Sequence, residues 1–150
     1  MDCGSRAVTE LEKEISPLDL DAVIISHYHP DHVADLGVLR HYFQLYPKHL
    51  WEPKILPIYG HTEDEQEFAK LTLDGVSQGK AYDVNGVEKV GPFDITFIKT
   101  VHPVPCYAFR IVERATGQTL VFTGDTGYFE GLDKFAAGAD LFLADVYLYA

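Results

Sequence analysis

The sequence predicts a mixed fold of α-helices and β-strands, of the α/β or α+β class. Short β-branched or alternating apolar runs, typical of strands, occur along the 150-residue chain. Segments with helical periodicity separate several of these runs. No window approaches the ~18 consecutive apolar residues that a membrane-spanning helix requires. The composition, 47% hydrophobic and 23% charged, is that of a globular domain, so we expect a single domain over residues 1–150.

In the first half of the chain, we expect two strands that are each followed by a helix. The predicted strands are 22–25 and 55–59, and the predicted helices are 31–46 and 62–71. Pro47 follows the first helical pattern and predicts its end. Thr62 and Glu65 have the spacing of a capping box, which predicts where the second helix begins.

The second half is expected to be mostly strands. The predicted strands are 93–98, 107–112, 119–123 and 141–144, and the predicted helix is 129–137. The first of these strands alternates apolar with less apolar side chains, as a sheet with one buried face requires. Thr116 and Gly117 predict a turn between two strands, and Gly138 predicts the end of the helix.

Charge and cysteine content restrict the classes of function. With 23 acidic and 12 basic residues the formal net charge is −11. Non-specific nucleic-acid binding depends on releasing counterions from phosphates, so neither a stable nucleic-acid partner nor a membrane partner is expected. Cys3 and Cys106 are too few for a disulfide framework and lack CxxC spacing. They are expected to be buried, reduced thiols of a cytoplasmic protein.

Three of the seven histidines fall within six residues, where the first predicted strand meets its helix. Alternate residues of an extended segment point the same way, so His27 and His29 can reach one metal ion. Pro30 suits the first turn of a helix, which would turn Asp31 and His32 aside toward a second site. Imidazole and carboxylate ligands suit Zn²⁺ and also iron or manganese. This loop therefore predicts a metal centre.

Two later residues follow the ends of other predicted strands. His102 comes after the strand at 93–98, and Asp125 comes after the strand at 119–123, between glycines that permit a sharp turn. Side chains at the ends of separate strands are typical of a site at the edge of a sheet. We expect both to be metal ligands, whereas His61 is expected to be a turn histidine.

The chain resembles the metallo-β-lactamase superfamily over nearly its whole length. The run His27-Tyr28-His29-Pro30-Asp31-His32 resembles the HxHxDH signature of that family. His102 and the turn Gly124-Asp125-Thr126 resemble its third and fourth ligand segments, and Asp2-Cys3-Gly4 resembles its Asp-x-Gly segment. The resemblance implies an α+β fold, a four-layer αββα sandwich with metals at one edge.

The resemblance also implies a ligand set and a reaction. One metal ion would be held by His27, His29 and His102, and the other by Asp31 and His32, with Asp125 bridging the two. The implied cofactors are two divalent ions, with Zn²⁺ favoured and Mn²⁺ or Fe²⁺ open. They would share a water and lower its pKa toward ~7. Asp31 would be the catalytic residue that accepts the proton of that water.

Within the superfamily, residues 102–111 resemble the segment around the third histidine of ribonuclease Z relatives. Only two predicted strands and a turn separate His102 from Asp125, which leaves no room for the arm by which ribonuclease Z grips tRNA. The sequence thus favours hydrolysis of a small-molecule or short phosphodiester. A lactamase or a glyoxalase II-type thioesterase using the same site is the alternative. A metal-stabilised, non-catalytic binding domain is a further one.

The resemblance finally implies that the chain is a fragment and its fold incomplete. Family members usually carry a β-hairpin before the Asp-x-Gly segment, which here begins at Asp2, and a final histidine ligand after the last strand. No histidine follows His102. We therefore expect the N-terminal strands and the final-ligand segment to be absent, the second metal ion to bind weakly, and copies of the chain to associate through uncovered strands.

Overall fold

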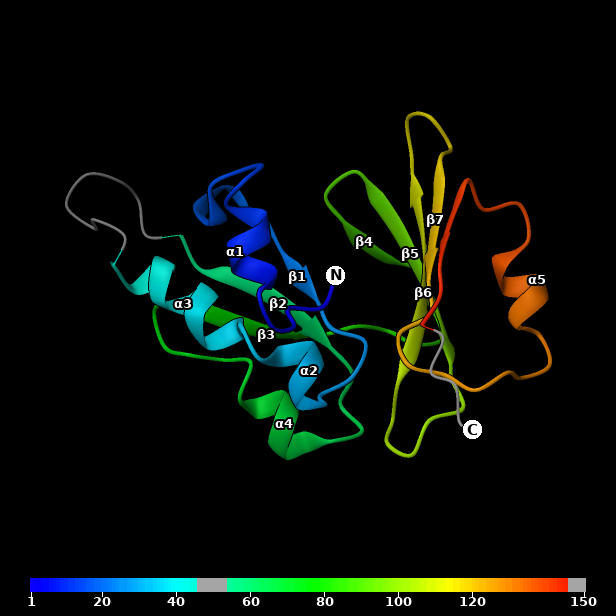
Figure 1. Ribbon diagram of the computed structural model, residues 1–150, viewed down its shortest axis with the longest axis horizontal. Coiled ribbons are helices and arrows are strands. Elements are labelled where there is room, and N and C mark those ends of the chain that lie inside the picture. Colours follow the sequence, from blue (N-terminus) through cyan, green and yellow to red (C-terminus); the bar gives the residue numbers. More distant parts are fainter. Residues whose placement is uncertain (46–53, 146–150) are drawn as a thin grey trace. The chain divides into compact units, whose positions relative to one another are not determined.

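The computed structural model describes residues 1–45 and 54–145 of the chain. The chain divides into two compact units, Met1–Ala81 and Tyr82–Ala150. Figure 1 shows that each unit has its own sheet with helices beside it. The mixture of helices with two separate sheets confirms the predicted fold class. The expectation of one domain over residues 1–150 stays a prediction.

The first unit is built on a three-stranded parallel sheet in the order β1-β2-β3. Its strands are β1 (Val23–Ile24), β2 (Leu56–Gly60) and β3 (Ser77–Ala81). Its helices are α1 (Ala7–Leu11), the 3-10 helix η1 (Pro17–Asp19), α2 (Pro30–Val33), α3 (Leu36–Leu45) and α4 (Glu65–Ala69). Ile24 pairs with Tyr59, so β1 and β2 end at the same edge of the sheet.

Apolar side chains from these strands and helices form the core of the first unit. Its largest fully buried members are Ile25, Leu39, Leu56 and Ile58. The β-branched run at 22–25 thus forms β1 and continues into the core through Ile25, and β2 lies one residue later than the predicted 55–59.

The predicted helix 31–46 is wrong as one continuous helix. It is divided into α2 and α3 around Ala34 and Asp35. The backbone N–H of Asp35 donates to the Cys3 carbonyl, and the Asp35 carboxylate accepts from Val8 N–H. The bond from Asp35 N–H to Cys3 takes the place of the helical hydrogen bond to the carbonyl four residues earlier, and the bond from Val8 holds the Asp35 side chain. Residue 46 lies outside the described residues.

The predicted capping box is also wrong, although a helix does follow it. The Asp64 carboxylate, not the Thr62 hydroxyl, caps α4 by accepting from Glu67 N–H at 3.0 Å. Aspartate is as good an N-cap as serine and better than threonine, and Glu65 and Glu67 place further negative charge in the first turn.

The second unit is built on a five-stranded sheet in the order β4-β5-β6-β7-β8. Its strands are β4 (Glu88–Val90), β5 (Phe93–Lys99), β6 (Tyr107–Glu113), β7 (Thr119–Phe122) and β8 (Leu141–Leu143). Neighbouring strands are antiparallel except for the parallel pair β7 and β8. The predicted turn is confirmed: Gly117 has φ 75° and its N–H donates to the Glu113 carbonyl.

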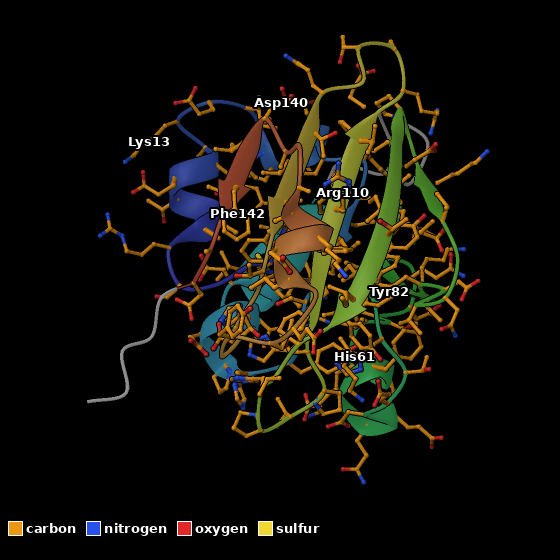
Figure 2. The ribbon with its side chains drawn as sticks, turned by 90° about the vertical axis from the view of Figure 1, so that its right-hand side faces the viewer. Lys13, His61, Tyr82, Arg110, Asp140 and Phe142 are labelled. Atoms are coloured by element: carbon orange, nitrogen blue, oxygen red, sulfur yellow. The ribbon has the colours of Figure 1, made fainter. Side chains whose placement is uncertain are left out.

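Helix α5 (Leu132–Ala136) is shorter than the predicted 129–137, because Gly131 precedes it with φ 103°, and Gly138 (φ 70°) follows it. Arg110 of β6 holds this helix. Its Nη1 donates to the carbonyls of Phe135 and Ala137 at 2.9 and 3.0 Å, and Figure 2 shows Arg110 beside α5.

Among the described residues, no helix combines the length and the apolar character that crossing a membrane requires.

Both cysteines are free and buried, as predicted. Burial, with a smaller contribution from the Asp35 carboxylate, raises the pKa of the Cys3 thiol to about 11. At pH 8, only about one Cys3 in a thousand is then a reactive thiolate. We expect iodoacetamide at pH 8 to alkylate Cys3 at least ~100-fold more slowly in the folded protein than in urea, as measured by mass spectrometry. Equal rates in the two states would contradict this environment for Cys3.

Candidate metal centre

The segment that carries His27, His29 and His32, called the histidine loop below, begins where β1 ends. Ile25 N–H still donates to the Tyr59 carbonyl, which extends the pairing with β2 by one residue. The ring of His27 then lies 4.7 Å from the ring of His29 and 4.2 Å from the ring of His32, measured between centroids. The first unit alone therefore gathers three imidazoles from one short segment.

Pro30 explains how one loop can do this. His29 is still extended (φ −61°, ψ 146°), whereas Pro30 is the first residue of α2. His27 and His29 therefore share the side of an extended segment, while Asp31 and His32 are carried onto a helical turn. This confirms the predicted change of backbone geometry at Pro30.

A carboxylate near the start of the chain orients two members of the loop. Asp2 accepts three hydrogen bonds of 2.7 Å, from Ser26 N–H, from the Ser26 hydroxyl and from His32 Nδ1. Because Nδ1 of His32 holds this proton, its neutral ring carries the lone pair on Nε2. A carboxylate that fixes a histidine in this way is a common second partner of metal-binding histidines.

Ser26 also fixes the tautomer of His27. Its hydroxyl donates to Asp2, so at the 3.1 Å contact with His27 the ring Nδ1–H is the donor and Ser26 Oγ the acceptor. The lone pair of a neutral His27 is then also on Nε2. Both histidines would therefore offer a metal the same nitrogen.

The sequence reasoning did not find these roles of Asp2 and Ser26. The Asp-x-Gly segment could have indicated them, because both its aspartate and its glycine are required by the structure. Asp2 has a positive φ of 41°, which aspartate tolerates better than most residues. A Cβ at Gly4 would clash with the Asp31 carbonyl oxygen, so glycine lets the two segments approach.

In the second unit, His102 and Asp125 lie close together. His102 Nε2 lies 4.0 Å from Asp125 Oδ2. The Thr100 hydroxyl donates to the Asp125 carbonyl at 2.9 Å, and Gly127 N–H donates to the Val101 carbonyl at 2.9 Å. These bonds hold the segment after β5 against the segment after β7.

The donor set fits a divalent metal ion. Neutral imidazole nitrogens and carboxylate oxygens are the ligands that zinc prefers besides thiolate. The 4.0 Å between His102 and Asp125 is too long for a hydrogen bond. It is within the reach of one ion that forms two bonds of about 2.0–2.2 Å. That residues of both units hold the same ion stays a prediction.

The other residues singled out from the sequence lie as follows. The Asp31 side chain is 75% exposed, and its Oδ2 lies 3.6 Å from His32 Nε2. His61 lies directly after β2 and is only 2% exposed.

Comparisons with known proteins find relatives in sequence and in structure. The family model described as the metallo-beta-lactamase superfamily matches residues 1–150. The probable metallo-hydrolase YhfI of Bacillus subtilis is 41% identical over 150 residues, covering 100% of this chain and 61% of YhfI. Ribonuclease Z of Mycobacterium bovis (strain BCG / Pasteur 1173P2) is 28% identical over 170 residues, covering 93% of this chain and 56% of that protein.

The crystal structure of YhfI superposes with a TM-score of 0.86 at 42% identity, covering 94% of this chain and 55% of that one. The chain thus spans just over half to about three fifths of the length of these relatives. The family model matches all 150 residues, and this match shows the family. The chain belongs to the metallo-beta-lactamase superfamily.

Proposed function

We propose that this chain carries a metal-dependent hydrolase site that acts on a phosphodiester. The observation that supports this most is the loop after β1, where His27, His29 and His32 converge while Asp2 and Ser26 orient two of them. Histidines that merely face solvent would not need their tautomers set by a partly buried carboxylate.

The family resemblance assigns the ligands. His27, His29 and His102 would hold one divalent ion, and Asp31, His32 and Asp125 would complete the second site. Bound ions would supply hydroxide at neutral pH and positive charge for the oxygens of the transition state. Zn²⁺ is the favoured metal because imidazole nitrogen dominates the first set.

The chain's own residues would do the rest. Asp31 is an exposed carboxylate on the first turn of α2 and can take a proton from the attacking water. Asp2 and Ser26 would keep the Nε2 atoms of His32 and His27 directed at the metals. Both rings would bind the metal in their neutral form, through the lone pairs on these atoms.

One observation supports a phosphodiester as the substrate, and two favour a small one. A relative 28% identical to the chain is a ribonuclease Z. Between His102 and Asp125 the chain has only β6, β7 and the turn at Gly117, so no arm for tRNA interrupts this connection. With a net charge of −11, the chain suits a small or short phosphodiester better than a long nucleic acid.

A panel of three substrates tests the proposal. The chain at matched zinc loading is assayed with bis(p-nitrophenyl) phosphate, nitrocefin and a glutathione thioester. We expect measurable turnover of the phosphodiester, at least ~10-fold faster than of the other two, and loss of at least ~100-fold in Asp31→Asn. Turnover of the lactam or thioester alone would reverse the choice of substrate. Bound metal with no turnover of any of them would favour a non-catalytic binding domain.

A further inference from the structure

Tyr28 stands between two proposed ligands of one metal ion and points away from both of them. The rings of His27 and His29 are close neighbours, and His29 is extended. In such a segment, the side chain of the intervening residue lies on the opposite side. A contact that holds the Tyr28 side chain in place therefore also holds the backbone that carries both imidazoles.

The end of β2 fixes Tyr28. The Tyr28 hydroxyl donates a 2.6 Å hydrogen bond to the His61 carbonyl, and the two rings lie 4.6 Å apart at 48°. His61 is buried at the same sheet edge as the histidine loop, since β1 and β2 run parallel. Figure 2 places His61 beside the green helix α4.

Gly60 provides the space for this contact. A Cβ at this position would clash with the Tyr28 hydroxyl, and it would lie 3.3 Å from Tyr28 Cζ and 2.9 Å from Leu71 Cδ1. Gly60 does not have a positive φ, so its role is space rather than backbone conformation. The Tyr28 hydroxyl therefore occupies the space that a side chain at position 60 would need.

Hydrogen bonds and burial hold the residues near the Tyr28 contact. Three residues after His61, Asp64 caps α4, and the Ser77 hydroxyl of β3 donates to the Leu71 carbonyl at 2.8 Å. Leu71 belongs to the core of the first unit. A hydrogen bond to such a fixed carbonyl can hold the histidine loop in one position.

We propose that Tyr28 is a positioning residue, packed against Gly60 and hydrogen-bonded to the His61 carbonyl. It sets the direction in which the imidazoles of His27 and His29 point. This inference rests on the proposed metal site. Tyr28 touches neither metal nor substrate in this account; it acts through its two neighbours in the chain.

Zinc and cobalt titrations of the whole chain test it, beginning with the unsubstituted protein. Tyr28→Phe removes only the hydroxyl and is expected to raise the Kd for Zn²⁺ about 10-fold. The visible absorption of bound Co²⁺ should also change in intensity or wavelength, which a merely structural role would not cause. Tyr42→Phe is the matched control, because the Tyr42 hydroxyl also donates to a partner, Glu12, within the same unit.

A second pair of variants keeps the test valid if stability changes. Gly60→Ala should weaken zinc binding further than Tyr28→Phe. In the Tyr28→Phe background, the added methyl should cost less affinity, because its closest clash, with the Tyr28 hydroxyl, is gone and only the 2.9 Å approach to the flexible end of Leu71 and the contact with the ring remain. Such non-additivity would not arise if residue 60 acted only on folding.

The outcomes separate this inference from the proposed function. If the unsubstituted chain binds neither Zn²⁺ nor Co²⁺, the metal site itself is wrong. If it binds both, and Tyr28→Phe matches Tyr42→Phe in Kd within twofold and in its Co²⁺ spectrum, the positioning role is overturned. A tenfold weaker Kd with a changed spectrum, at an unfolding midpoint equal to that of Tyr42→Phe, supports it.

Discussion

Replacing His29 with alanine is expected to abolish tight metal binding and to reduce hydrolysis to background. The substitution removes an imidazole whose ring centroid lies 4.7 Å from that of His27. His29 lies in the extended part of the loop, directly before α2. Loss of a partner that only orients a ligand typically costs 10–100-fold in metal affinity. Loss of the ligand itself should cost at least ~100-fold. Zinc titration and elemental analysis of the purified protein measure the effect.

His41→Ala is the control for this experiment. His41 is exposed on α3, with its Nδ1 3.3 Å from the Gln44 side chain, and has no part in the proposed site. This variant should retain the metal content of the unsubstituted chain. Equal metal content in His29→Ala and His41→Ala would show that the histidine loop does not hold the ion.

The second large effect is expected for Asp2→Asn. Asparagine tolerates the positive φ at this position, so the change tests the carboxylate rather than the backbone. Its amide has one acceptor oxygen, whereas the carboxylate accepts from Ser26 N–H, the Ser26 hydroxyl and His32 Nδ1. We expect the free energy of unfolding to fall by about 1–3 kcal/mol and zinc affinity to fall about 10–100-fold.

Urea unfolding and zinc titration of the same samples measure the two effects. Asp21→Asn is the matched control: the Asp21 side chain is 98% exposed, with only a long ion pair of 3.9 Å to Lys54, and such pairs contribute little. If Asp2→Asn behaves like Asp21→Asn in both measurements, Asp2 does not orient the histidine loop.

The parts of the fold that could be predicted are those in which burial follows a regular pattern. Strands β5 and β6 have strong alternating or apolar character, and both were predicted within one residue of their observed bounds. Strand β3 was missed because its sequence, Ser77–Ala81, is polar and mostly exposed, so no hydrophobic period marks it. Strand β4 has only three residues, two of them charged.

Tertiary hydrogen bonds account for what the sequence could not reveal in the first unit. The apolar stripe of 31–46 continues across Asp35, so periodicity predicts one helix, while bonds from Asp35 to Cys3 and Val8 divide it. The metal-binding residue types could be recognised from their spacing. The residues that orient them could not be recognised in this way. Asp2 and His61 lie far along the chain from the residues that they contact.

In the proposed metal site, His29 of the first unit and His102 of the second would bind the same metal ion. Zinc titration of the unsubstituted chain, His29→Ala, His102→Ala and the double variant tests it most directly. We expect one tightly bound ion per chain and its loss in either single variant. The double variant should lose little more, because the effects of removing two ligands of one ion are not additive. A His102→Ala protein that binds zinc as tightly as the unsubstituted chain would contradict it.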